Sequence, residues 1–274
     1  MTTVSQREFG QPTPIQRAVQ QRECTQQGSA ASLSPTEGLA TQASKAEVSK
    51  EHTRSWYWMF LLGIPVLAIL AFAIFQPIVV LPRMGLGPGF GLTEGSGQRL
   101  TNEDLRGTIV LYNFTYTSCA TPCPQTTPVM AEIHNLLDEM NLQTIPVALV
   151  TISFDPERDG PTVLSAYAQR FIDSADRAAA PWYFVTGDPL PLKYVIGGGF
   201  GTYYQANDDG TFTFDPTFVL VDGAGIIRAK YRTATPDIAT MQRDIELVAK
   251  EAVESTGATR LAYEAAHLFL CYPK

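Results

Sequence analysis

The fold class is decided by the stretch TIVLYNFTYTSCATPCPQ, residues 108–125. It opens with a run of β-branched and aromatic residues typical of a buried strand, and it ends with Cys119 and Cys123 among prolines. Apolar residues with helical spacing follow at 128–140, so the cysteines mark the junction of a strand and a helix. A helix N-terminus favours the thiolate form of a cysteine. We therefore expect a reactive cysteine pair here.

Strand and helix patterns alternate beyond this junction. Short apolar runs rich in β-branched residues predict strands, and apolar residues three to four apart predict helices. This order predicts an α/β fold in which helices cover both faces of a mixed sheet. The expected elements are strands at 146–154 and 181–187, a hairpin at 217–231, and helices at 128–140, 161–172 and 237–253.

The spacing of Cys119 and Cys123 permits two chemistries. Four residues apart on a helical turn, the sulfurs can form a disulfide or can both bind one soft metal, and thiolates select Cu(I) or Zn(II). A purely structural disulfide is the plainer interpretation. Cys24 and Cys271 stand alone near the two ends, and a chain of 274 residues can bury a core without disulfide staples.

An apolar segment at 56–81 predicts a single transmembrane helix. Residues 59–75 contain no charge, the whole segment exceeds the roughly 20 residues that a span needs, and aromatic residues at 56–58 suit the membrane interface. Lysines and arginines precede the segment, which places the N-terminus in the cytoplasm and residues 83–274 outside. We expect a single-pass protein of the cell membrane with an extracytoplasmic, periplasmic domain.

The remaining segments complete the expected organisation. Residues 1–55 have the composition of a disordered cytoplasmic tail, and residues 82–98 are glycine-rich and predict a flexible linker. The folded domain is expected at 99–254, followed by an apolar tail at 255–274. The net charge of −7 and the lack of a basic stripe argue against a nucleic-acid partner.

Residues 100–253 resemble the SCO/SenC family. The resemblance is carried by four passages, LTNEDLRGTIVLYNFTYTSCATPCPQ, ISFDPERDGPTVLSAYAQRF, WYFVTGD and FVLVDGAGIIR. Members of that family are membrane-tethered, thioredoxin-fold proteins linked to assembly of the copper centre of cytochrome oxidase. The resemblance thus implies a thioredoxin-like fold, an N-terminal anchor, and a cytochrome oxidase subunit or another exported cysteine-containing protein as the partner.

The resemblance also implies that Cys119 and Cys123 are copper ligands. The family's third ligand is a histidine about eight residues before the position of Asp222. This chain has Phe214 there, followed by Asp215. Its three histidines are His52, His134 and His267; the first is expected across the membrane and the second lies nearly three helical turns from Cys123, so neither is expected to share a metal with the cysteines.

The run DPTFVLVD, which begins at Asp215, resembles thioredoxin-like reductases, in which a cis proline faces the dithiol. Pro216 occupies that position, and a cis proline is a costly, placed feature. An ordinary trans proline at the start of a strand is the alternative. With no histidine nearby, this similarity favours thiol–disulfide exchange over copper transport.

Two further groups of residues have open roles. His267 and Cys271 are four apart and share one face of a helix, so they are either a docking helix with an incidental histidine or a tail that supplies the missing metal ligand. Asp155, Arg158 and Asp159 are either electrostatic neighbours of the dithiol or turn residues that cap the second helix.

Three functions follow from the sequence. The first is a thiol–disulfide oxidoreductase with Cys119, Cys123 and Pro216 as its catalytic residues, serving assembly of a respiratory copper centre. The second is a Cu(I) metallochaperone that binds copper through the same two cysteines and has no enzymatic activity. The third is a non-catalytic subunit of a respiratory complex.

Overall fold

The structure is a computed structural model that describes only part of the chain. The fold discussed below belongs to the unit of residues 60–274. The expected tail at 1–55, with Cys24 and His52, and the residue Cys271 lie outside the described residues. The described residues are 57–58, 60–67, 70–71, 79–120, 123–172, 180–257 and 259–269.

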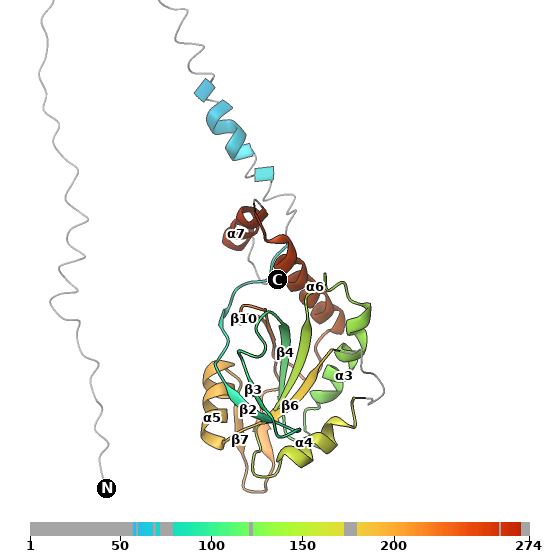
Figure 1. The fold of residues 1–274 in the computed structure, drawn as a ribbon. Helices are drawn as coiled ribbons and strands as arrows, with labels where there is room; N and C mark the ends of the chain where they lie inside the picture. Colours follow the sequence, from blue (N-terminus) through green and yellow to red (C-terminus); the bar gives the residue numbers. More distant parts are fainter. Residues whose placement is uncertain are drawn as a thin grey trace, which may run out of the picture. The chain divides into compact units, whose positions relative to one another are not determined.

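A mixed sheet of eight strands forms the centre of the domain, in the order β1-β10-β9-β4-β5-β6-β2-β3 (Figure 1). Its middle strands β4, β5 and β6 run parallel to one another, whereas β9 runs antiparallel to β4. All residues of β4 and β5 are buried, as expected for strands covered on both faces. The strands are β1 (Gly85–Leu86), β2 (Gly91–Glu94), β3 (Arg99–Thr101), β4 (Ile109–Thr115), β5 (Val147–Ser153), β6 (Trp182–Thr186), β9 (Phe218–Val221) and β10 (Ile226–Tyr231).

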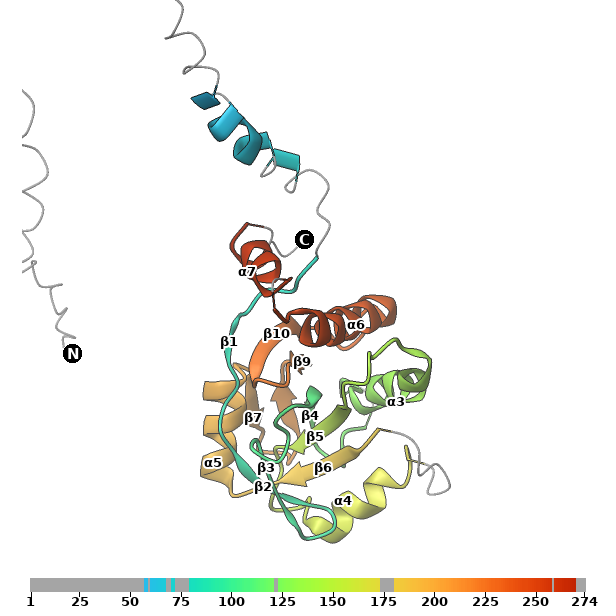
Figure 2. The same ribbon diagram turned by 45° about the horizontal axis from the view of Figure 1, so that its top comes forward.

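Helices cover both faces of this sheet (Figure 2), which confirms the expected architecture. One face packs against α3 (Thr127–Leu136), α4 (Pro161–Ala168) and α6 (Ile238–Glu254). The other face packs against α5 (Pro189–Lys193) and the π-helical turn η2 (Tyr194–Gly199). Alternate residues of each strand enter the two cores because strand side chains point to opposite faces. In β4, Ile109 and Leu111 enter one core, and Val110 and Tyr112 enter the other.

The expected flexible linker at 82–98 is instead part of the sheet. β1 pairs with β10, and β2 pairs with both β3 and β6. The glycines in this segment allow close packing, because a Cβ on Gly95 would come within 2.9 Å of the backbone nitrogen of Ser165. Leu92 is fully buried in the core. The glycine-rich composition therefore reflects close approach of backbones rather than a free tether.

The expected transmembrane helix at 56–81 is only partly described. Its described residues are helical at 57–58, 60–67 and 70–71, and across the described parts of the chain no helix is both long and apolar enough to cross a bilayer. Residues 79–81 are not helical, and Val80 is buried against Tyr263 and Ala266. The last three residues of the predicted span thus belong to the folded domain.

The expected apolar tail at 255–274 contains helix α7 (Thr259–Phe269), which packs on α6. A buried arginine organises this end of the domain. Arg228 donates to Glu251 at 2.6 Å, to Asp222 at 3.1 Å and to the carbonyl oxygen of Leu81 at 2.8 Å. His267, on α7, lies 2.8 Å from Glu251. Burial raises the pKa of Glu251, but the bonds from Arg228 and His267 outweigh burial and hold that pKa below its usual range.

We expect Arg228→Met to destabilise the domain by about 3–5 kcal/mol, because it leaves two carboxylates, Asp222 and Glu251, without their buried cation. The free energy of unfolding from urea titration measures the effect. The matched control is Arg106→Met, which removes an exposed arginine paired with Glu103 and should cause a much smaller loss. Equal losses in the two variants would contradict this role of Arg228.

Candidate functional site

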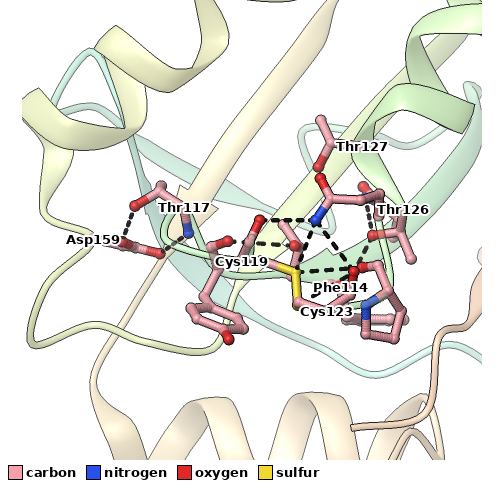
Figure 3. Close-up of a disulfide and its surroundings, with 12 residues drawn as sticks. Phe114, Thr117, Cys119, Cys123, Thr126, Thr127 and Asp159 are labelled. Atoms are coloured by element: carbon pink, nitrogen blue, oxygen red, sulfur yellow. Dashed lines mark hydrogen bonds between the residues drawn. A yellow bond between two sulfur atoms is a disulfide. The ribbon is translucent and has the colours of Figure 1, made fainter. Parts of the chain in front are cut away.

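The two cysteines lie in the turn between β4 and α3, where they form a disulfide (Figure 3). Their Cα atoms are 5.5 Å apart, which is an ordinary separation for a disulfide. Helix α3 begins at Thr127, so both cysteines precede it at the predicted junction of strand and helix, and the helical turn expected between them is not part of α3. Pro124 disfavours helical conformation at Cys123, the residue before it.

Backbone and side-chain bonds hold this turn. The N–H of Cys119 donates to the carbonyl of Tyr116 at 3.1 Å, and the N–H of Cys123 donates to the carbonyl of Ala120 at 2.8 Å. The side-chain amide of Gln125 donates to the carbonyls of both cysteines, at 2.8 Å and 3.2 Å. The exposed side chain of Gln125 therefore binds the backbone at both ends of the disulfide loop. No pattern in the sequence predicted this role.

The carbonyl oxygen of Pro124 faces both sulfurs. It lies 3.4 Å from the Sγ atom of Cys119 and 3.9 Å from that of Cys123. Disulfide sulfurs carry no proton, so these are contacts in the oxidised form. In the reduced form either thiol can donate to this oxygen. The amide of Gln125 lies 3.6 Å from the Sγ atom of Cys119, close enough for its N–H to stabilise a thiolate there.

A buried chain of hydrogen bonds fixes the start of α3. Trp182 donates to Thr151 at 2.9 Å, and Thr151 donates to Asn113 at 2.7 Å. Asn113 in turn donates to Thr126 at 3.1 Å, and Thr126 donates to the carbonyl of Phe114 at 3.2 Å. Because Thr126 directly precedes α3, this chain joins the helix to the centre of the sheet. The only sign of it in the sequence is the presence of polar residues within apolar strands.

Asp159 holds the residues that precede the disulfide. Its fully buried carboxylate accepts the N–H of Thr117 at 2.8 Å, the hydroxyl of Thr117 at 2.5 Å and the hydroxyl of Ser153 at 2.5 Å (Figure 3 shows the bonds to Thr117). Helix α4 has no side-chain cap, so capping is not the role of Asp159. Asp155 instead forms an ion pair with Arg158. Burial raises the pKa of the Asp155 carboxyl, and the nearby arginine opposes that rise.

Several aromatic rings belong to the buried core against which the disulfide packs. Phe214 is only 7% exposed, and its ring centroid lies 5.1 Å from that of Phe154 and 6.4 Å from that of Tyr116. The strands β7 (Tyr204–Ala206) and β8 (Phe212–Phe214) contribute the other rings. Both cysteines pack against the larger buried core to which these rings belong. Phe214, which stands where the resemblance implies the family's third copper ligand, is thus a buried aromatic ring.

The residues present do not form a three-ligand metal site. Within the described ranges, no three histidines, cysteines or carboxylates gather in a way that could hold a metal ion. His134 is buried, with its Nε2 atom 2.8 Å from the carbonyl oxygen of Ala180. Among the described residues of this turn, the two sulfurs are the side-chain donors that suit a soft metal, and they are joined to each other.

His267 does not lie at this end of the domain. Glu251, which His267 contacts, binds Arg228. Arg228 directly follows Ile227, and Ile227 pairs with Val221 in β9. Val221 also pairs with Val110 at the start of β4, whereas the disulfide follows the end of that strand. The seven residues of β4 span about 20 Å. The idea that the C-terminal helix supplies the missing ligand through His267 is therefore not supported.

Pro216 lies at the edge of the sheet that carries the disulfide. It precedes β9, whose first residue Phe218 pairs with Asn113 near the end of β4. Its neighbour Asp215 donates its N–H to the carbonyl of Tyr203 at 3.0 Å, which holds this loop to β7. The position agrees with the expected role beside the dithiol. A cis peptide bond and a part in catalysis stay predictions.

We expect Asp159→Asn to destabilise the oxidised protein by about 1–3 kcal/mol. The amide replaces one acceptor oxygen with a donor, so one of the bonds from Thr117 or Ser153 is lost inside the protein. The free energy of unfolding from urea titration measures this loss. The control is Asp138→Asn, at an exposed position. A loss no larger than that of the control would show that Asp159 does not hold the loop.

The comparisons with known proteins agree with this architecture. The family profile described as SCO1/SenC matches residues 82–250. The "SCO2-like protein" of Rickettsia felis is 34% identical over 135 residues, which cover 49% of this chain and 60% of that protein. The "SCO1 protein homolog" of Bacillus subtilis is 32% identical over 98 residues, covering 36% and 47%. The matches thus span about half the length of these relatives.

Solved structures show the same fold. The SCO1/SenC family lipoprotein of Bacillus anthracis has a TM-score of 0.55 at 24% identity, and the match covers 62% of this chain and 99% of that one. The BsSco protein has a TM-score of 0.54 at 22% identity, with 63% and 98% covered. These likenesses confirm the thioredoxin-like α/β fold. With a family profile that spans most of the folded domain, the chain belongs to the SCO1/SenC family.

Proposed function

We propose that this protein carries out thiol–disulfide exchange during assembly of the copper centre of cytochrome c oxidase. The observation that supports the proposal is the disulfide between Cys119 and Cys123, which packs against a buried core that includes Phe214 in place of a metal-binding histidine. BsSco, which shares the fold, is described as having a disulfide switch and as a member of a family of cytochrome c oxidase assembly proteins.

The exchange begins from the reduced form. The thiolate of Cys119 attacks one sulfur of a target disulfide, and the other target sulfur leaves as a thiolate that takes up a proton. Cys123 then loses its proton and attacks the Cys119 sulfur, which releases the second target sulfur. The target disulfide gains two electrons, and the protein ends with the Cys119–Cys123 disulfide. Gln125 favours the first step because its amide is directed at the Cys119 sulfur.

The partner and the location follow the same proposal. The target is an exported cysteine-containing protein such as a cytochrome oxidase subunit. The apolar segment that begins at residue 56 anchors the chain in the cell membrane, with the N-terminus in the cytoplasm and the folded domain in the periplasm or its equivalent. The run of uncharged residues at 59–75 and the basic residues before it support this arrangement.

Transport of Cu(I) is the second candidate. The related structures of Arabidopsis thaliana ScoI and yeast Sco1 are both described with copper bound, at TM-scores of 0.51 and 0.50. When reduced, Cys119 and Cys123 offer two thiolates, which suit Cu(I). The buried ring of Phe214 leaves them without the third ligand of the family. We therefore rank copper transport below exchange, and a purely structural subunit lower still because it needs neither cysteine.

A trapping experiment tests the exchange reaction in membranes that contain the full-length chain. All variants also carry Cys24→Ser and Cys271→Ser, so that no other thiol can react. Cys123→Ser should accumulate a dithiothreitol-sensitive adduct with the target, because Cys119 attacks and no second thiol resolves the intermediate. The matched variant Cys119→Ser should accumulate much less. If neither variant forms an adduct, the exchange proposal fails.

A titration separates exchange from copper transport. The reduced full-length protein in detergent, without oxygen, should bind Cu(I) only when both Cys119 and Cys123 are present, and it should bind Cu(II) weakly. Copper content and absorbance after desalting measure the binding of Cu(I) and the binding of Cu(II). Tight, stoichiometric binding of Cu(II) would reverse our ranking of the two functions, because it requires a further ligand.

A further inference from the structure

A groove with a volume of about 460 Å³ lies beside the disulfide, between the turn after β4 and helix α4. We propose that this groove binds the cysteine-bearing segment of the target protein. Its first wall is formed by Thr117 and Ser118, the two residues directly before Cys119, so a segment bound in the groove lies next to the turn that carries the cysteines. The lining residues are Thr117, Ser118, Thr162, Val163, Ala166, Tyr167 and Arg170.

Hydrogen bonds hold both walls of the groove in place. Thr117 is bound through its N–H and its hydroxyl to the buried carboxylate of Asp159. On the other wall, the hydroxyl of Tyr167 donates to Thr127, the first residue of α3, at 3.0 Å. These bonds tie α4 and the disulfide turn to the same framework. A site formed in advance loses little conformational entropy when it binds a partner.

The surface of the groove indicates what kind of segment fits. Its floor is apolar, and Val163 is 42% exposed although it is a large hydrophobic residue on a helix. The guanidinium of Arg170 lies 5.4 Å from the ring centroid of Tyr167 and supplies the only charged side chain of the lining. Asp159, which is fully buried, is not part of that lining.

These features select an apolar side chain and a carboxylate close to the target cysteine. Val163, Ala166 and Tyr167 bury the apolar side chain, and Arg170 pairs with the carboxylate. Binding there raises the local concentration of the target sulfur next to Cys119, so it accelerates the first step of exchange. The inference rests on the proposed function, because it concerns the substrate of the same cysteine pair.

Two disulfide probes test the groove with the reduced full-length protein in detergent, again with Cys24→Ser and Cys271→Ser in every sample, which here counts as the wild type. One is a peptide with leucine and aspartate next to its cysteine, joined to a thionitrobenzoate that absorbs when released. The other is bis(2-hydroxyethyl) disulfide, which is neutral and too small to fill the groove. Arg170→Glu should slow the reaction with the peptide by about fivefold. The same substitution should speed the reaction with a peptide that has lysine in place of aspartate, and it should leave the rate of reaction with the small probe unchanged.

A second pair of variants tests the apolar floor. Val163→Asp should slow the reaction with both peptides, whereas Val253→Asp, on the distant helix α6 and 39% exposed, should change neither. Arg232→Glu is the control for the charge reversal. Unchanged peptide rates in Arg170→Glu and Val163→Asp would overturn the groove and leave exchange standing. An equal slowing of the small probe would also overturn it, because the variants then damage the cysteine pair. If the wild-type protein reduces no probe, the proposed function itself fails.

Discussion

The parallel pairing of β4 with β5 is the constraint on which the site depends. All seven residues of the two strands are paired, from Ile109 with Val147 to Thr115 with Ser153. Because parallel strands end at the same edge of a sheet, the turns that follow them emerge side by side. Asp159 can therefore bind Thr117, although 42 residues separate them in the sequence. Without this register, the loop before the disulfide would lose its buried acceptor.

The same edge of the sheet has two different sides, and this difference bears on the chemistry. On one side, the cysteines pack against a core that includes the rings of Phe214, Tyr116 and Phe154, and such rings are poor ligands for a metal ion. On the other side, the groove along α4 is open and mostly apolar. A cysteine pair with one apolar wall and one accessible side suits contact with a second polypeptide better than storage of an ion.

The sequence predicted the elements whose pattern is local, and it missed those that depend on distant contacts. The alternating elements from β4 to α6 follow from apolar spacing, and the position of Cys119 and Cys123 follows from the strand that precedes them. The segment 82–98 was misjudged because its glycines serve close packing, which no local pattern records. The bonds from Asp159 and Gln125 were equally hidden, since a carboxylate or an amide finds its partner only after the sheet has formed.

The two ends of the sheet have different roles in the domain. At one end, Arg228 and Glu251 hold the incoming chain through the carbonyl of Leu81 and the side chain of Arg83. At the other end, β4 leads directly to the disulfide. The strand between them fixes their separation, so the point where the chain enters cannot obstruct the cysteines. A partner that exchanges disulfides with Cys119 therefore meets the end of the domain opposite to Leu81 and Arg83.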